Sequence, residues 1–220
     1  CGSGLQAINN AAQQISCGIS DTIIAGGAES MSTAPYYLRK ARYGYGAGNA
    51  ELVDPNTESQ PRAQPIEKYG NLTMGLTAEN LASKYNISRE EQDEFALESQ
   101  QKAATAIQDG KFKEEIVPFE IKNKKEIIQF TTDEHPRLTS IEKLASLKPV
   151  FKEDGTVTAG NSSGRNDGAA ALVMMSEDLA LKQGLTPRLR IVAQASVGVP
   201  PEIMGIGPVP ATLTSRFKIR

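Results

Sequence analysis

The feature that most limits the fold is an apolar segment that follows an amphipathic one near the start of the sequence. The first segment places apolar residues at the spacing of one helical face: Leu5, Ile8, Ala11, Ala12 and Ile15. This spacing predicts a helix, and Gly18 follows as its stop signal. Residues 21–28 are apolar, partly β-branched and end in glycines, which predicts a buried strand. A helix that leads into a buried strand so quickly is typical of an α/β sheet.

Helical signals return after a loop-rich segment at 31–75. A short helix is predicted over 77–85. A longer helix starts at Ser88, because Glu91 stands in capping-box position, and it stops at Gly110. Its predicted buried residues are Phe95, Ala96, Ala103 and Ile107.

The rest of the chain alternates short strands, helices and turns. We expect strands at 116–121, 127–131, 169–175 and 190–199, the third as a continuous apolar run. Thr139 and Glu142 predict a second capping box, and a further helix passes through Leu179 and Leu181. Residues 205–210 predict a turn.

Composition argues against several classes of partner. The formal net charge is −2, which gives no strong field toward nucleic acid or a membrane surface. No apolar run approaches the roughly 20 residues that span a bilayer. Cys1 and Cys17 are too few for a disulfide framework, so we expect a reduced, cytoplasmic compartment. With His135 as the single histidine, we expect no metal site.

The sequence opens on a cysteine among small residues, in the order Cys1, Gly2, Ser3 and Gly4, directly before the first predicted helix. The positive end of a helix dipole favours the thiolate form of a cysteine. The glycines leave room for a bulky thioester to reach the sulfur. The motif therefore indicates a nucleophilic cysteine, and the alternative is a small buried cysteine in a tight turn.

Two further glycine-rich segments are candidates for lining a ligand site. Residues 26–32 follow the first predicted strand, where open α/β sheets bind ligands, although glycines there also serve strand–helix packing. Residues 155–168 combine glycines with Asn and Ser groups suited to lie near a thioester. The alternative is a long turn closed by Asx and Ser/Thr hydrogen bonds. No lysine follows at P-loop spacing, which argues against a nucleotide-phosphate loop.

Six segments together resemble the thiolase family, and they occur in the family's order. They are CGSG at 1–4, AGGAESMS at 25–32, MGLTAENLASKYNISREEQDEFALESQ at 74–100, GKFKEEIVPF at 110–119, TAGNSSGRNDGAAALVMMS at 158–176 and MGIGPVPA at 204–211. The resemblance implies an α/β fold, an αβαβα layered sandwich of two similar halves with an inserted loop domain, here incomplete. It assigns 1–30 and 161–188 to the first half, 31–160 to the inserted loop domain, and 189–220 to the start of the second half.

The same resemblance implies an acyltransferase that works by thiolysis of a 3-ketoacyl-CoA or by synthesis of acetoacetyl-CoA. It carries over Cys1 as the nucleophile, Met74 and Met204 as residues facing the pantetheine arm, Ser163 as a coenzyme A contact, and Arg137 near the nucleotide end. Acyl-CoA and coenzyme A are the implied binding partners, as substrates, and no separate cofactor is implied. The full-length form is expected to be a homo-oligomer.

Some features of the family are missing from the sequence. The resemblance places a second catalytic cysteine and an activating histidine in the second half, which this sequence does not reach. We expect the natural chain to begin upstream of Cys1, and we expect this chain alone to show little or no turnover. One alternative is an inactive, truncated remnant that at most binds coenzyme A or a partner chain. Another is a related condensing enzyme such as a ketoacyl synthase, although the long insert favours a thiolase.

Overall fold

The computed structural model describes residues 2–122 and 126–217, and its internal contacts divide the chain into two units. Unit 1 comprises Cys1–Asn71 and Arg165–Arg220, and unit 2 comprises Leu72–Gly164. Unit 2 therefore interrupts unit 1 along the sequence. The predicted domain boundaries, including an inserted loop domain at 31–160, stay a prediction.

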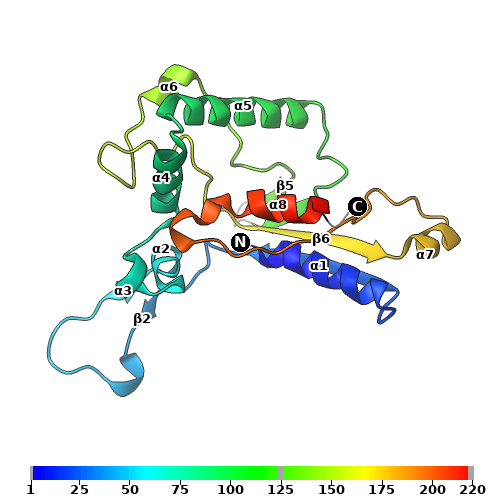
Figure 1. The fold of residues 1–220 in the computed structure, drawn as a ribbon, viewed down its shortest axis with the longest axis horizontal. Helices are drawn as coiled ribbons and strands as arrows, with labels where there is room; N and C mark the ends of the chain where they lie inside the picture. The colour runs from blue at the N-terminus through cyan, green and yellow to red at the C-terminus, as the bar shows by residue number, and fades with distance from the viewer. Residues whose placement is uncertain (1, 123–125, 218–220) are drawn as a thin grey trace. The chain divides into compact units, whose positions relative to one another are not determined.

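Unit 1 is built on a helix that packs against a two-stranded antiparallel sheet (Figure 1). The helix is α1, Ser3–Ser16, and the strands are β1, Thr22–Glu29, and β6, Gly168–Met175. The register runs from the pair Thr22 and Met175 to the pair Glu29 and Gly168. Two strands that are far apart in the sequence are thus direct neighbours in the sheet.

The core of unit 1 lies between α1 and one face of this sheet. Ala11 of α1 and Ala25 of β1 are buried, whereas Ile24 and Val173 on the opposite face are 73% and 66% exposed. The prediction of a buried strand is therefore wrong for one of its two faces, because α1 covers only the other. The helix ends as predicted, since Gly18 adopts a left-handed φ of 68° that residues with a side chain rarely take.

Short elements complete unit 1. Between β1 and unit 2 lie β2 (Tyr37–Leu38), η1 (Ala41–Tyr43), β3 (Leu52–Val53), α2 (Pro55–Glu58), η2 (Pro61–Ala63) and α3 (Ile66–Tyr69). This segment is loop-rich, as the sequence predicts, and its β2 and β3 pair antiparallel. After β6 come α7 (Glu177–Lys182), η3 (Pro201–Ile206) and α8 (Pro208–Phe217).

Two predictions for the region after α7 are wrong. Residues 190–199 form no strand, because a strand needs a hydrogen-bonded neighbour and none of the described strands pairs with this segment. The turn predicted at 205–210 is instead the end of η3 and the start of α8. Pro201 and Pro208 each begin a helical element, where the missing N–H is not needed.

Unit 2 contains three helices and an antiparallel pair of strands among its described residues. They are α4 (Met74–Tyr85), α5 (Arg89–Gln108), α6 (Ile141–Ala145), β4 (Phe119–Lys122) and β5 (Ile127–Phe130). The capping box predicted at the start of α5 is confirmed, since Glu91 N–H donates to Ser88 and Ser88 N–H donates to Glu91. Figure 1 shows α6 beside the beginning of α5.

Unit 2 differs from the prediction in the burial of α5 and in the N-cap of α6. Phe95 of α5 is 74% exposed, whereas the neighbouring Asp93 is 2% exposed and belongs to the core. The reason is that α5 faces hydrogen-bonding groups: Asn161 donates to Asp93, and Arg89 of α5 donates to the carbonyl oxygen of Leu144 in α6. The cap of α6 is Ser140 and not Thr139, because the Ser140 hydroxyl accepts from Lys143 N–H at 3.4 Å.

No helix within the described residues combines the length and the apolar character needed to cross a bilayer.

Candidate functional site

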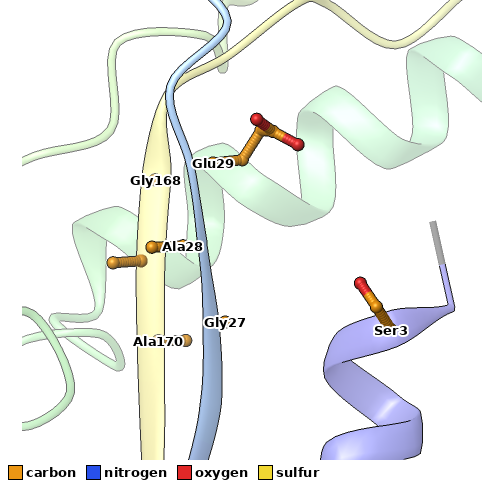
Figure 2. Close-up of a pocket in the computed structure, with 7 residues that line it drawn as sticks. Ser3, Gly27, Ala28, Glu29, Gly168 and Ala170 are labelled. Carbon is orange, nitrogen blue, oxygen red and sulfur yellow. The ribbon is translucent and has the colours of Figure 1, made fainter.

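The start of α1 borders an open hollow beside β1 and β6 (Figure 2). Its lining residues are small except for one carboxylate: Ser3, Gly27, Ala28, Glu29, Gly168, Ala169 and Ala170. The hollow has a volume of about 410 Å³. Figure 2 shows Ser3 on the first turn of α1, across from the two strands that carry Gly27 and Ala170.

Glycines allow the helix and the sheet to come close at this hollow. A Cβ added to Gly27 would lie 3.7 Å from the Cα of Gly4, so the two backbones are nearly in contact. A Cβ added to Gly26 would lie 2.9 Å from the Cα of Ala171, which is closer than a side chain tolerates. Gly27 therefore lets α1 approach the sheet closely at the hollow, whereas Gly26 leaves room for the backbone of β6 beside β1.

The first turn of α1 supplies hydrogen-bond donors and positive potential. The first N–H groups of a helix have no intrahelical partner, and the N-cap residue Gly2 has no side chain to cap them. The helix is 14 residues long, so its dipole is well developed at this end. A thiolate or a developing oxyanion near this turn would be stabilised.

A carboxylate fastens the rim of the hollow where β1 ends and β6 begins. Asp167 accepts hydrogen bonds from the Ser32 hydroxyl, from Ser32 N–H at 2.9 Å and from the Ser30 hydroxyl at 3.5 Å. The Ser32 hydroxyl and then the Ser32 N–H hold the pKa of Asp167 below its ordinary value of 3.8. The segment that follows β1 is thereby tied to the residue that precedes β6, on the strand side of the hollow.

The site residues predicted from the sequence fall into both units. Cys1 lies outside the described residues. Met204 lies in η3 of unit 1 and is 41% exposed. In unit 2, Met74 is the first residue of α4 and is 38% exposed, and Arg137 and Ser163 are exposed loop residues. The assignment of these residues to one site stays a prediction.

Unit 2 also contains buried polar side chains next to the segment that carries Ser163. We call Glu79, Asp93, Thr158 and Asn161 the polar network; the first three are 6%, 2% and 0% exposed and Asn161 is half-buried. Glu79 accepts from Thr156 N–H and from Val157 N–H at 2.8 Å. Asn161 donates from Nδ2 to Asp93 Oδ1 at 2.9 Å.

Sequence reasoning missed the polar network. Its members come from α4, α5 and the segment 156–161, so no local pattern connects them. One signal was present for Asp93, which stands three residues before Ala96 and therefore on the face of the helix that was predicted to be buried. A carboxylate in that position is almost never fully buried without partners, which marks it as part of a specific arrangement.

Comparison with known proteins identifies the family. The family model described as "Thiolase, N-terminal domain" matches residues 1–178. An acetyl-CoA acetyltransferase of Pseudomonas aeruginosa is 51% identical over 214 residues, which are 96% of this chain and 53% of that protein. The chain therefore spans about half the length of the curated relatives it matches.

Solved structures give the same result for the fold. The crystal structure of the Bacillus anthracis acetyl-CoA acetyltransferase matches all of this chain and 55% of its own with a TM-score of 0.92 and 48% identity. A human mitochondrial 3-ketoacyl-CoA thiolase in complex with CoA matches all of this chain and 54% of its own with a TM-score of 0.89 and 44% identity. These matches confirm the predicted α/β fold of thiolase type, of which the chain contains a part. Because the family model covers most of the sequence and the relatives agree with it, this chain belongs to the thiolase family.

Proposed function

We propose that this chain supplies the acyl-accepting cysteine of a thiolase-type acyltransferase, with Cys1 as the nucleophile and coenzyme A thioesters as substrates. The observation that carries the proposal is the open hollow in front of the first turn of α1, two residues beyond Cys1 in the sequence. Acyltransferase or thiolase names among the relatives support the same reaction. They do not favour the alternative of an inactive remnant.

The chemistry proposed for Cys1 is acyl transfer. Its thiolate attacks the carbonyl carbon of the thioester, the carbon–sulfur bond to coenzyme A breaks, and the coenzyme leaves as a thiolate that takes up a proton. A free thiol with a pKa of about 8.5 is only a few per cent ionised at neutral pH, so the positive end of α1 would raise the reactive fraction. Backbone N–H groups of the first turn would stabilise the oxyanion.

We propose that Met74 and Met204 face the pantetheine arm, that Ser163 contacts coenzyme A and that Arg137 lies near its nucleotide end. A family relative has been solved with CoA bound, which supports this class of ligand. The exposed positions of Met74, Arg137 and Ser163 leave their side chains accessible to such a ligand. Methionine suits an adaptable apolar arm, and a guanidinium suits phosphate.

The decisive experiment is acylation of the protein by acetyl-CoA, read by mass spectrometry of the peptides. We expect one acetyl group on Cys1 and none on Cys17, which is an exposed free thiol and serves as an internal control. Cys1→Ser should abolish labelling, whereas Cys17→Ser should leave it unchanged. Equal labelling of both cysteines, or labelling of neither, would contradict the proposal.

We also propose that the protein acts in the cytoplasm and that its full-length form is a homo-oligomer. The segment between β1 and unit 2 exposes apolar and aromatic side chains, including Tyr36 at 64% and Tyr43 at 91% exposure. Such side chains are enriched at protein interfaces. Light scattering on the purified full-length form would test the oligomeric state, and a monomer at micromolar concentration would contradict the proposed homo-oligomer.

A further inference from the structure

We infer that the polar network positions Ser163 for coenzyme A, an inference that rests on the function proposed above. Ser163 is exposed and follows Asn161 by two residues. Two residues of chain span at most about 7 Å, so fixing Asn161 confines the Cα of Ser163 to a small volume. The members of the network thus act as positioning residues that do not themselves touch the ligand.

The turn before Ser163 is closed by hydrogen bonds in both directions. Thr158 Oγ1 accepts from Gly160 N–H at 3.2 Å and from Asn161 N–H at 3.3 Å. Asn161 Oδ1 in return accepts from Thr158 N–H at 2.8 Å. Thr158 is 0% exposed, so water cannot replace its hydroxyl group if that group is removed.

The turn is also fastened to α5. Asn161 Nδ2 donates to Asp93 Oδ1 at 2.9 Å and to Thr156 O at 3.0 Å. Asp93 is held by an ion pair with Arg89, whose Nε lies 2.8 Å from Asp93 Oδ2. Arg89 donates in addition to the carbonyl oxygens of Leu144, in α6, and of Leu147, two residues after α6 ends. The turn therefore rests on a chain of contacts that reaches two helices.

A second anchor holds the beginning of the same segment to α4. Both carboxylate oxygens of Glu79 accept from Thr156 N–H, at 2.9 and 3.0 Å, and Oε1 accepts from Val157 N–H. Gln92 Nε2 donates to Thr156 Oγ1 at 2.9 Å. Residues 156–161 are thus fixed at both ends before any ligand arrives. A segment ordered in advance loses less conformational entropy on binding, which raises affinity.

A matched pair of substitutions separates hydrogen bonding from packing. Thr158→Val keeps the shape of the side chain and removes the acceptor, whereas Thr158→Ser keeps the acceptor and removes a methyl group. Two readouts are needed: calorimetric titration with coenzyme A, and amide hydrogen exchange of residues 156–163 compared with α5. Gln92→Ala is a milder variant that acts on the same segment from α5.

We expect Thr158→Val to weaken coenzyme A binding about tenfold and to speed exchange in 156–163 by a similar factor, with exchange in α5 unchanged. Thr158→Ser should keep the affinity for coenzyme A and the exchange rate of 156–163 within about threefold of the unmodified chain. Gln92→Ala should weaken binding and speed exchange less than Thr158→Val does. The inference is overturned if Thr158→Val binds coenzyme A as well as the unmodified chain, if exchange in 156–163 does not change, or if Thr158→Ser is as weak as Thr158→Val. An unmodified chain that does not bind coenzyme A would instead refute the proposed function, and this inference with it.

Discussion

Replacing Glu79 with alanine should strongly destabilise unit 2, because it leaves buried backbone donors without an acceptor. Glu79 is 6% exposed, and it accepts from Thr156 N–H, Val157 N–H and the Thr156 hydroxyl. A hydrogen bond to a charged group contributes about 1.5–3 kcal/mol, so two backbone bonds account for about 3–6 kcal/mol. Water entering the space left by the side chain recovers part of this, and we expect a loss of about 3 kcal/mol.

The assay is urea unfolding followed by far-UV circular dichroism, which reports the helices. The free energy of unfolding should fall while the dependence on urea concentration stays the same, because the surface exposed on unfolding hardly changes. Glu98→Ala is the control, since its carboxylate is exposed on α5 and pairs with Lys102 at 2.7 Å in an exposed i,i+4 ion pair. That pair contributes about 0.5 kcal/mol or less. A loss below about 1 kcal/mol for Glu79→Ala would refute the reasoning.

Three further predictions concern packing and pH. Leu144→Ala should cost about 2–4 kcal/mol in urea unfolding, because Leu144 is 3% exposed in the core of unit 2. Gly75→Ala should lower the melting temperature, because the new methyl group would overlap the ring of Phe151. Asp167→Asn should remove a contribution to stability that is present above pH 3.8 and is lost as pH falls through the lowered pKa of Asp167. The difference in melting temperature between the unmodified chain and this variant should therefore shrink in acid.

Each of these changes has a matched control. Leu181 is 64% exposed, so Leu181→Ala should change stability by less than about 0.5 kcal/mol. Gly46→Ala adds a methyl group with no atom within 4 Å and should leave the melting temperature unchanged. Asp133→Asn removes an exposed carboxylate and should keep the acid dependence of the unmodified chain. If Asp167→Asn has the same dependence of melting temperature on pH as the unmodified chain, the role assigned to Asp167 is contradicted.

The elements with strong local signals could be predicted from the sequence. The limits of α1 follow from its apolar spacing and from Gly18, and the start of α5 follows from the capping box of Ser88 and Glu91. Strands β1 and β6 were visible as apolar runs. These signals act within a few residues, so the sequence contains all that is needed to recognise them.

Properties that depend on distant partners could not be predicted in this way. Helical spacing places Phe95 inward, but the residues opposite α5 are polar, and the structure buries Asp93 instead. Residues 190–199 have strand composition and lack a pairing partner among the described strands. For the site, the local motif at Cys1 is enough to predict a nucleophile. The hydrogen bond between Asp93 and Asn161 joins residues 68 positions apart, so no local sequence pattern predicts it.

The pairing of β1 with β6 has a consequence for synthesis on the ribosome. Glu29 ends β1 and its partner Gly168 begins β6, so β1 emerges long before its neighbour exists. At about 5–20 residues per second, the nascent chain waits roughly 7–28 seconds for that neighbour. All of unit 2 emerges in this interval and has time to fold first, while β1 remains without its partner strand β6. We therefore expect a chaperone to bind the nascent chain most often after β1 is complete and before β6 has emerged.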